Sequence, residues 1–74
     1  MKGAVIVRIN ITKLSIAMAR KKLNYSELSD LSNVSRTTLS YIKNGKSCRP
    51  KIAAQIADAL GVDVTEIIES GEVG

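Results

Sequence analysis

The fold is decided by the stretch Asn24–Gly45, which reads NYSELSDLSNVSRTTLSYIKNG. Its first residues predict a short helix that begins at Tyr25. The side chain of Asn24 can accept a bond from the first helical turn, and Glu27, three residues later, can accept one from the Asn24 backbone. These two bonds form a capping box, so the stretch opens with a well-defined helix start.

The body of this helix is predicted to pack against a second one. Leu28 and Leu31 are three residues apart and so share one helix face, while the small Ser29 and Ser32 allow another helix to approach closely. Asn33 then tolerates the left-handed backbone conformation that a tight turn between helices requires. We expect the chain to turn at this residue.

A second helix follows the turn directly. Val34 is expected to point back into the core, and the hydroxyl of Ser35 offers the second N-terminal cap. The helix runs from Arg36 and ends near Gly45, which occupies the usual position just beyond a helix C-terminus. Two short capped helices joined by a tight turn form a helix-turn-helix, at about residues 25–44.

The two faces of the second helix differ. At about 100° per residue, Leu39 and Ile42 lie on the inner face, with Arg36 and Lys43 on the flanks. The opposite face carries hydroxyls, a phenol and an amide, from Thr37, Ser40, Tyr41 and Asn44. A solvated surface is the ordinary explanation of such a face. Here the turn before it, the outward tyrosine and the absence of acids from this helix favour insertion into a DNA groove.

Charge is divided unevenly along the chain. All eleven Lys and Arg residues lie within residues 1–51, which hold only two acids, whereas residues 52–74 hold five acids and no base. The net charge of +4 therefore predicts a positive face that meets phosphates. By itself the charge indicates only a polyanionic partner, because RNA or an anionic membrane surface would suit it as well.

Length and composition narrow the function classes. The 74 residues suffice for a single domain, 1–74, with an aliphatic core and no separate ligand-sensing module, so no small-molecule ligand is expected. The chain has no His, and Cys48 is its one cysteine, so we expect no metal, no cofactor and no internal disulfide. Cys48 itself is interpreted as a bystander. Without a nucleophile–base pair, the chain is not expected to be an enzyme.

Two longer helices are predicted on either side of the helix-turn-helix. One runs from a cap at Asn10 or Thr12 to about Lys22. The other begins at Pro50 and ends at Gly61, the residue types that favour a helix start and a helix end.

A last short helix is predicted near the C-terminus. Asp63 and Glu66 have the spacing of a capping box, and Val64, Ile67 and Ile68 supply its apolar side chains. The expected fold class is therefore all-α, a compact domain of five helices.

The N-terminal residues 1–10 show a different pattern. Val5, Val7 and Ile9 alternate with other residues, which predicts a short extended segment. The apolar run is too short for a signal peptide or a membrane span, and Arg8 interrupts it. We therefore expect a cytoplasmic protein with no membrane partner.

These features together resemble one known family. The residues that carry the resemblance are Leu28-Ser29, Asn33 to Ser40, Ile42, Asn44 to Lys46 and Ile56 to Val62. They look like the Cro and lambda-repressor type of helix-turn-helix, also called the Xre family, over roughly residues 12–69. The resemblance implies that the start of the first motif helix and the outward face of the second approach the major groove, and that the following loop contacts phosphate.

The sequence departs from that family at three positions. Tyr25 stands where the family usually has Gln, Asn33 stands where it usually has Gly, and Met18 falls where Arg or Lys is frequent. A phenol can still donate to a phosphate, and Asn fits the turn at a modest cost in free energy. A phosphate contact from position 18 is lost.

The chemistry of each side chain, together with the resemblance, suggests its role. The candidates for reading bases are Arg36, Thr37, Ser40, Tyr41 and Asn44. The candidates for contacting phosphate are Tyr25, Ser35, Lys43, Lys46 and Arg49. Ser35 is first a helix cap, and for Lys43 a merely solvated position is an equal alternative.

One recognition helix reads too few base pairs to select a site, so we expect a homodimer, at least on DNA. Its interface would come from the last helix, through Ile67 and Ile68, or from the N-terminal segment, through Val5 and Val7. Of the two isoleucines, one is expected to be inward and the other exposed.

The expected function is sequence-specific binding of double-stranded DNA by a transcriptional regulator, a repressor that occupies an operator. Two other classes stay open. A protein-interaction module, such as an antitoxin or adaptor, would purify with an unrelated protein. An architectural or recombination-accessory DNA binder would bend its DNA.

Overall fold

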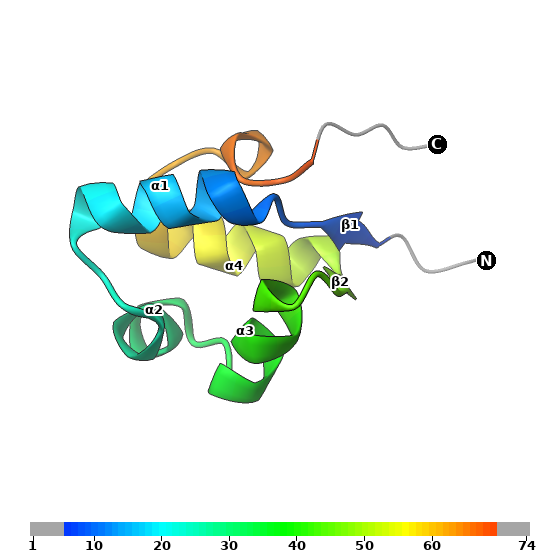
Figure 1. Cartoon of the computed structure of the whole chain (residues 1–74), viewed down its shortest axis with the longest axis horizontal. Helices are drawn as coiled ribbons and strands as arrows, with labels where there is room; N and C mark the ends of the chain where they lie inside the picture. Colours follow the sequence, from blue (N-terminus) through cyan, green and yellow to red (C-terminus); the bar gives the residue numbers. More distant parts are fainter. Residues whose placement is uncertain (1–5, 70–74) are drawn as a thin grey trace.

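The computed structural model describes residues 6–69 of the chain. Within them lie four α-helices, two short strands and one 3₁₀ turn. Their bounds are β1 Val7–Arg8, α1 Ile11–Lys21, α2 Tyr25–Ser32, α3 Arg36–Lys43, β2 Ser47–Cys48, α4 Pro50–Leu60 and η1 Val64–Glu66. Figure 1 shows α1 alongside α4, with α2 and α3 together on one side of this pair and η1 on the other.

The core is aliphatic and lies where α1 and α4 face α2 and α3. Its buried side chains include Leu14, Ala17 and Met18 of α1, Leu28 of α2, Leu39 and Ile42 of α3, and Ala53, Ile56, Ala57 and Leu60 of α4. The inward positions predicted for Leu39 and Ile42 of α3 are therefore confirmed. Because α4 packs against α2, the core also fixes where the helix-turn-helix sits.

The ends of α1 and α4 follow the local sequence. Of the two predicted caps for α1, Asn10 is the one used, since its Oδ1 accepts a bond from the backbone N–H of Lys13 at 3.0 Å. Pro50 is the first residue of α4, as predicted, and Gly61 ends it in the left-handed conformation with φ of 71°.

β1 joins the N-terminal segment to the loop that follows α3. It pairs antiparallel with β2, so that Val7 lies opposite Cys48 and Arg8 lies opposite Ser47. The predicted extended segment is therefore present at Val7–Arg8, and residues 1–5 of its predicted range lie outside the described residues.

The other edge of β1 is also occupied. Ile9 forms an antiparallel bridge with Ile68, and the backbone N–H of Glu69 donates to the carbonyl oxygen of Arg8 at 2.9 Å. The N–H of Asn10 donates to the carbonyl oxygen of Ile67 at 2.7 Å. The segment after η1 therefore runs extended along β1.

The prediction of a fifth α-helix is wrong. The segment after α4 makes one 3₁₀ turn, in which the N–H of Glu66 donates to the carbonyl oxygen of Asp63 and that of Ile67 donates to Val64. The turn is not continued, because the chain becomes extended at Ile68 to bond with the N-terminal strand. The described residues thus form four α-helices and a small sheet.

Leu31 also departs from its prediction. It is 61% exposed, whereas Leu28, expected on the same face, is fully buried. The buried face of α2 instead continues from Leu28 to Ser32, whose hydroxyl donates to the carbonyl oxygen of Leu28 at 2.6 Å. Gln55 of α4 donates to the carbonyl oxygen of Ser32 at 3.3 Å. The direction from which α4 approaches α2 therefore decides that Leu28 and Ser32, four residues apart, are buried in place of Leu28 and Leu31.

Candidate nucleic-acid interface

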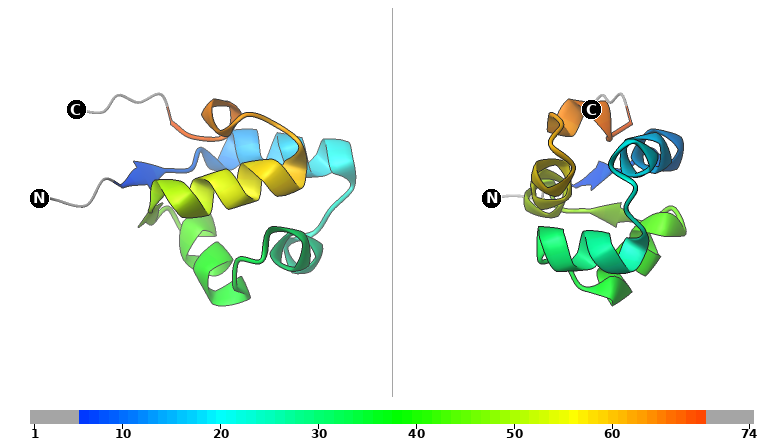
Figure 2. Two further views of the ribbon diagram at one scale, coloured as in Figure 1. Left: turned by 180° about the vertical axis from the view of Figure 1, so that it is seen from behind. Right: turned by 90° about the vertical axis from the view of Figure 1, so that its left-hand side faces the viewer.

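α2 and α3 form the predicted helix-turn-helix, seen from behind and from the side in Figure 2. The capping box is confirmed, since the N–H of Glu27 donates to Asn24 Oδ1 at 2.8 Å and that of Asn24 donates to Glu27 Oε1 at 2.9 Å. Asn33 has the predicted left-handed conformation, with φ of 63°. The hydroxyl of Ser29 donates to the carbonyl oxygen of Val34 at 2.6 Å and ties the turn to α2.

Both ends of α3 are fixed by local hydrogen bonds. At its start, the hydroxyl oxygen of Ser35 accepts a bond from the N–H of Thr38 at 3.1 Å, which confirms the predicted cap. At its end, Gly45 has φ of 92°, and the N–H of Lys46 donates back to the carbonyl oxygen of Tyr41 at 3.0 Å. α3 is therefore held as a short helix with a defined orientation.

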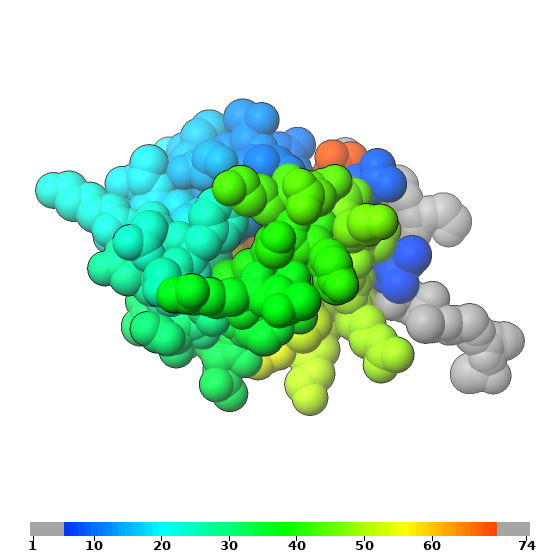
Figure 3. Space-filling view, turned by 60° about the horizontal axis from the view of Figure 1, so that its bottom comes forward, coloured from blue at the N-terminus to red at the C-terminus, as the bar shows by residue number. Residues whose placement is uncertain are grey.

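The outward face of α3 is exposed and rich in hydrogen-bonding groups. The side chains predicted to read bases, Arg36, Thr37, Ser40, Tyr41 and Asn44, are all exposed. Figure 3 shows α3, in green, at the centre of one face of the molecule. Tyr41 is 58% exposed. Packing against other residues in the range 6–69 therefore does not account for an aromatic side chain at this position.

Arg36 links the two helices of the motif. Its Nη2 donates to the hydroxyl oxygen of Ser26, in the first turn of α2, at 2.8 Å. A guanidinium carries five N–H donors, so this bond leaves others for a base or a phosphate. Ser26 was not among the predicted site residues, because a turn and most of a helix separate it from Arg36 in the sequence.

Tyr25 contacts α3 at the opposite end of that helix. The Nζ atom of Lys43 lies over the Tyr25 ring, 5.1 Å from its centroid, which is a cation–π distance. Desolvation by burial raises the pKa of the Tyr25 phenol, so the group is a neutral donor at physiological pH. A hollow of about 300 Å³ between the helices is lined by Tyr25, Ser26, Arg36, Leu39, Ser40 and Lys43.

The other phosphate candidates lie around α3. Lys46 and Arg49 are exposed on the segment that leads through β2 into α4. Ser35 is already engaged, because its hydroxyl donates to Thr38 Oγ1 at 2.9 Å in addition to capping the helix. The structure therefore brings Tyr25, Lys43 and Arg36 together around one hollow and leaves Lys46 and Arg49 as a separate group beyond the end of α3.

A comparison with protein-family models identifies the motif. A model described as helix-turn-helix, of the Cro/C1 type, matches residues 16–67, which contain α2, the turn and α3. The protein belongs to the Xre-like helix-turn-helix family. The resemblance expected from the sequence is confirmed. No curated protein matches the chain.

The Xre-like family is a family of DNA-binding regulatory domains, so this chain contains a domain of that kind. The family is not a family of enzymes. Between residues 6 and 69, no group of three His, Cys, Asp or Glu side chains is placed to hold a metal ion. None of the helices in that range combines the length and apolar character that crossing a membrane requires.

Cys48 is a core residue of this Xre-like protein. It lies in β2 and its side chain is buried with the hydrophobic core. Burial raises the pKa of its thiol, and a bond from the backbone of Ala53 opposes this only in part. The thiol is therefore mostly protonated at neutral pH.

The residues predicted for a dimer interface lie in different environments. Ile67 is 0% exposed and belongs to the core, so it cannot contact a second copy. Ile68 is partly buried and bridges Ile9, rather than being exposed as expected. Val7 is partly buried in β1, and Val5 lies outside the described residues. Because the protein's own chain pairs with both edges of β1, a second copy cannot add a strand there.

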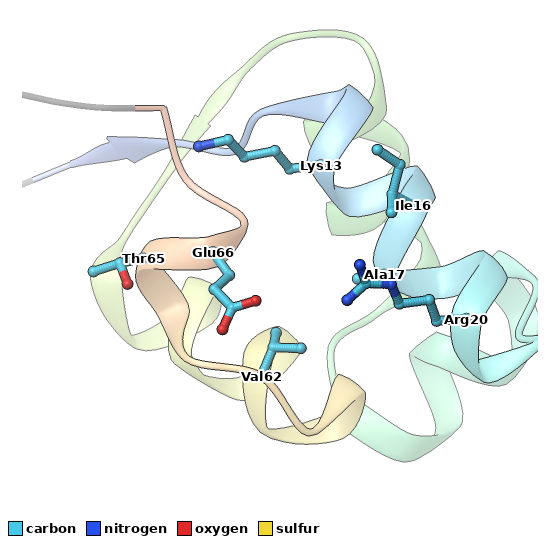
Figure 4. A pocket seen from close by; sticks show the side chains of 7 residues that line it. All are labelled: Lys13, Ile16, Ala17, Arg20, Val62, Thr65 and Glu66. Carbon is cyan, nitrogen blue, oxygen red and sulfur yellow. The ribbon is translucent and has the colours of Figure 1, made fainter.

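A second hollow, of about 380 Å³, lies between α1 and η1. Figure 4 shows Arg20 and Glu66 pointing toward one another from its two walls. Ile16, on the α1 wall, is 51% exposed. Figures 1 and 2 place α1 and η1 on the other side of the molecule from α3, so this hollow is not part of the candidate interface.

Proposed function

We propose that this protein is a sequence-specific transcriptional regulator, a repressor, that reads the major groove of double-stranded DNA with α3. The observation that carries the proposal is the outward face of α3, on which exposed hydrogen-bonding side chains stand on a helix fixed at both ends. An α-helix fits the major groove, where every base pair presents a distinct pattern of donors and acceptors.

The side chains of α3 suit different base edges. Arg36 can fork onto a guanine, the methyl group of Thr37 can meet a thymine methyl, and Asn44 can bond an adenine edge. Ser40 and Tyr41 carry hydroxyls that serve either bases or backbone. The bond from Arg36 to Ser26 orients the guanidinium before DNA arrives, which lowers the entropy lost on binding.

The cationic and phenolic groups around α3 suit phosphate. Lys43 over the ring of Tyr25 places an ammonium and a phenol on the same side of the motif, and both can donate to one phosphate oxygen or to neighbouring ones. Lys46 and Arg49 lie beyond the end of α3. Contacts of this kind fix the position of the protein without selecting a sequence.

We further propose that residues 1–74 act as one domain and bind as a two-fold dimer to inverted half-sites about one helical turn apart. A repressor of this kind blocks transcription by occupying its operator. Sedimentation of the free protein and of its DNA complex tests the dimer, which a strict monomer in both states would contradict.

Selection of bound duplexes from a random DNA pool at about 150 mM salt tests the function, because purely electrostatic binding is weak there. We expect enrichment of an inverted repeat over the pool carried through without protein. A single short motif would contradict the dimer but not base reading. No enrichment would contradict the proposed function and favour a protein-interaction role.

A further inference from the structure

β1 brings a cation from the N-terminal segment to the loop that follows α3. Arg8 of β1 and Ser47 of β2 are direct antiparallel partners. In Figure 3, β1, in dark blue, lies beside the yellow-green residues after α3, at the edge of the face whose centre is α3. Arg8 lies before residue 16, where the family match begins.

The outward face of this small sheet carries the charged side chains. Ile9 and Cys48 are buried, whereas Arg8 and Ser47 are exposed, as the two-residue alternation of a strand requires. Arg49 follows Ser47 by two residues, has extended backbone angles and is exposed. Arg49 therefore continues the same outward face.

Cross-strand geometry places the Cβ atoms of Arg8 and Arg49 near that of Ser47. Direct partners in an antiparallel pair have Cβ atoms about 4.5–5.5 Å apart, and diagonal neighbours lie about 7–8 Å apart. Arg8 is thus the direct neighbour of Ser47 and the diagonal neighbour of Arg49. Guanidinium groups and a hydroxyl are suitable donors for a phosphate.

The start of α4 adds to the positive potential at this place. Arg49 is its N-cap residue, and its side chain makes no capping bond. The positive end of the helix dipole therefore lies at Arg49, with no capping acceptor from this side chain. One opposing charge is near, because Glu69 is bonded through its backbone to Arg8 on the other edge of β1.

We infer that Arg8, with Ser47 and Arg49, forms a site for a DNA backbone phosphate beside the end of α3. This inference rests on the proposed function and extends it, since it adds a contact from a strand outside the helix-turn-helix. The N-terminal strand then serves to place a cation against the DNA as well as to complete the core.

The salt dependence of DNA affinity tests the inference, because each phosphate contact adds about 0.9 to the slope of log affinity against log salt concentration. The full chain and its Arg8→Gln, Arg8→Lys and Arg49→Gln variants are compared on the duplex that the wild-type protein selects. Arg20→Gln is the matched control, since Arg20 is an exposed arginine in the hollow on the other side of the molecule from α3.

We expect Arg8→Gln and Arg49→Gln each to lower the slope by about 0.9 for every protomer bound, and Arg8→Lys and Arg20→Gln to leave it unchanged. Thermal unfolding should be unaltered, because Arg8 is exposed and bonds its neighbours through its backbone. A wild-type slope for Arg8→Gln, or an equal decrease for Arg20→Gln, would overturn the inference alone. Absence of binding by the wild-type protein would instead overturn the proposed function.

Discussion

Individual side chains at the candidate interface differ in whether they should affect affinity, sequence preference or both. Arg36 lies at the N-terminal edge of α3 and is held by Ser26, so its free donors have a defined direction. Lys46 is exposed beyond the end of the helix, and we propose that its ammonium group contacts the backbone of the duplex. The two cations should therefore respond differently to replacement.

Replacement of Arg36 by Ala is expected to weaken binding to the selected duplex by roughly 1–3 kcal/mol, because a bidentate contact with a base is lost. Binding to a scrambled duplex should change much less. Lys46→Ala should weaken binding to both duplexes alike, since a phosphate contact carries no sequence information. Fluorescence anisotropy with the two labelled duplexes measures both effects. Equal losses on both duplexes for Arg36→Ala would show that this residue does not read bases.

Cys48 should react slowly in the folded protein. Its side chain is buried and burial raises the pKa of its thiol, so little of the reactive thiolate is present at pH 8. The rate of alkylation by iodoacetamide at this pH, with and without denaturant, measures the effect. We expect much faster reaction in denaturant, and similar rates in the two conditions would contradict the burial of this residue.

The packing of α2 against α3 requires one turn residue, Asn33, to adopt a left-handed backbone conformation. Asn33 joins α2 to α3 with φ of 63°, a conformation that Asn tolerates and most other residues with a Cβ atom do not favour. We expect Asn33→Ala to lower the free energy of unfolding by about 1 kcal/mol, and Asn33→Gly to change it little. Thermal unfolding followed by circular dichroism tests the pair. An Ala variant as stable as the Gly variant would contradict this account of the turn.

The helix ends of this protein were predictable because their signals are local. Each signal acts over a few residues of the chain. The bonds of the capping box join Asn24 and Glu27, the Ser35 cap bonds Thr38, and the N–H of Gly45 bonds Ile42, all three positions apart. The exposure of Leu31 was not predictable in the same way. It depends on the direction from which α4 approaches α2, which no spacing within α2 specifies.

The last element shows the same limit. Asp63 caps the turn through a bond from the N–H of Thr65, but the predicted capping box with Glu66 is not formed. The turn is also shorter than predicted, because the following residues leave it to bond with β1. The exposed positions on α3 follow from periodicity alone. The bond from Arg36 to Ser26 and the pairing of Arg8 with Ser47 join residues distant in sequence, so they required the folded structure.

At the scale of the whole molecule, the exposed groups suited to DNA favour one orientation of the protein on a duplex. The hydrogen-bonding face of α3 and the cations after it lie on one side, and the hollow between α1 and η1 lies on the other. Exposed acids gather in the later part of the chain, including Asp58, Asp63 and Glu66. We therefore expect a duplex that approaches α3 to meet the cations on and after this helix, which attract its phosphates.

The central claim is that the outward residues of α3 read bases in the major groove. The most direct measurement is duplex selection from a random pool at about 150 mM salt, done in parallel with the wild-type protein and the double variant Thr37→Ala, Ser40→Ala. Arg20→Gln serves as the control, because its side chain lies on the side away from α3. We predict that the wild-type and control proteins enrich the same motif, and that the double variant loses preference at particular positions within it. An identical motif from the double variant, or no motif from the wild-type protein, would contradict the claim.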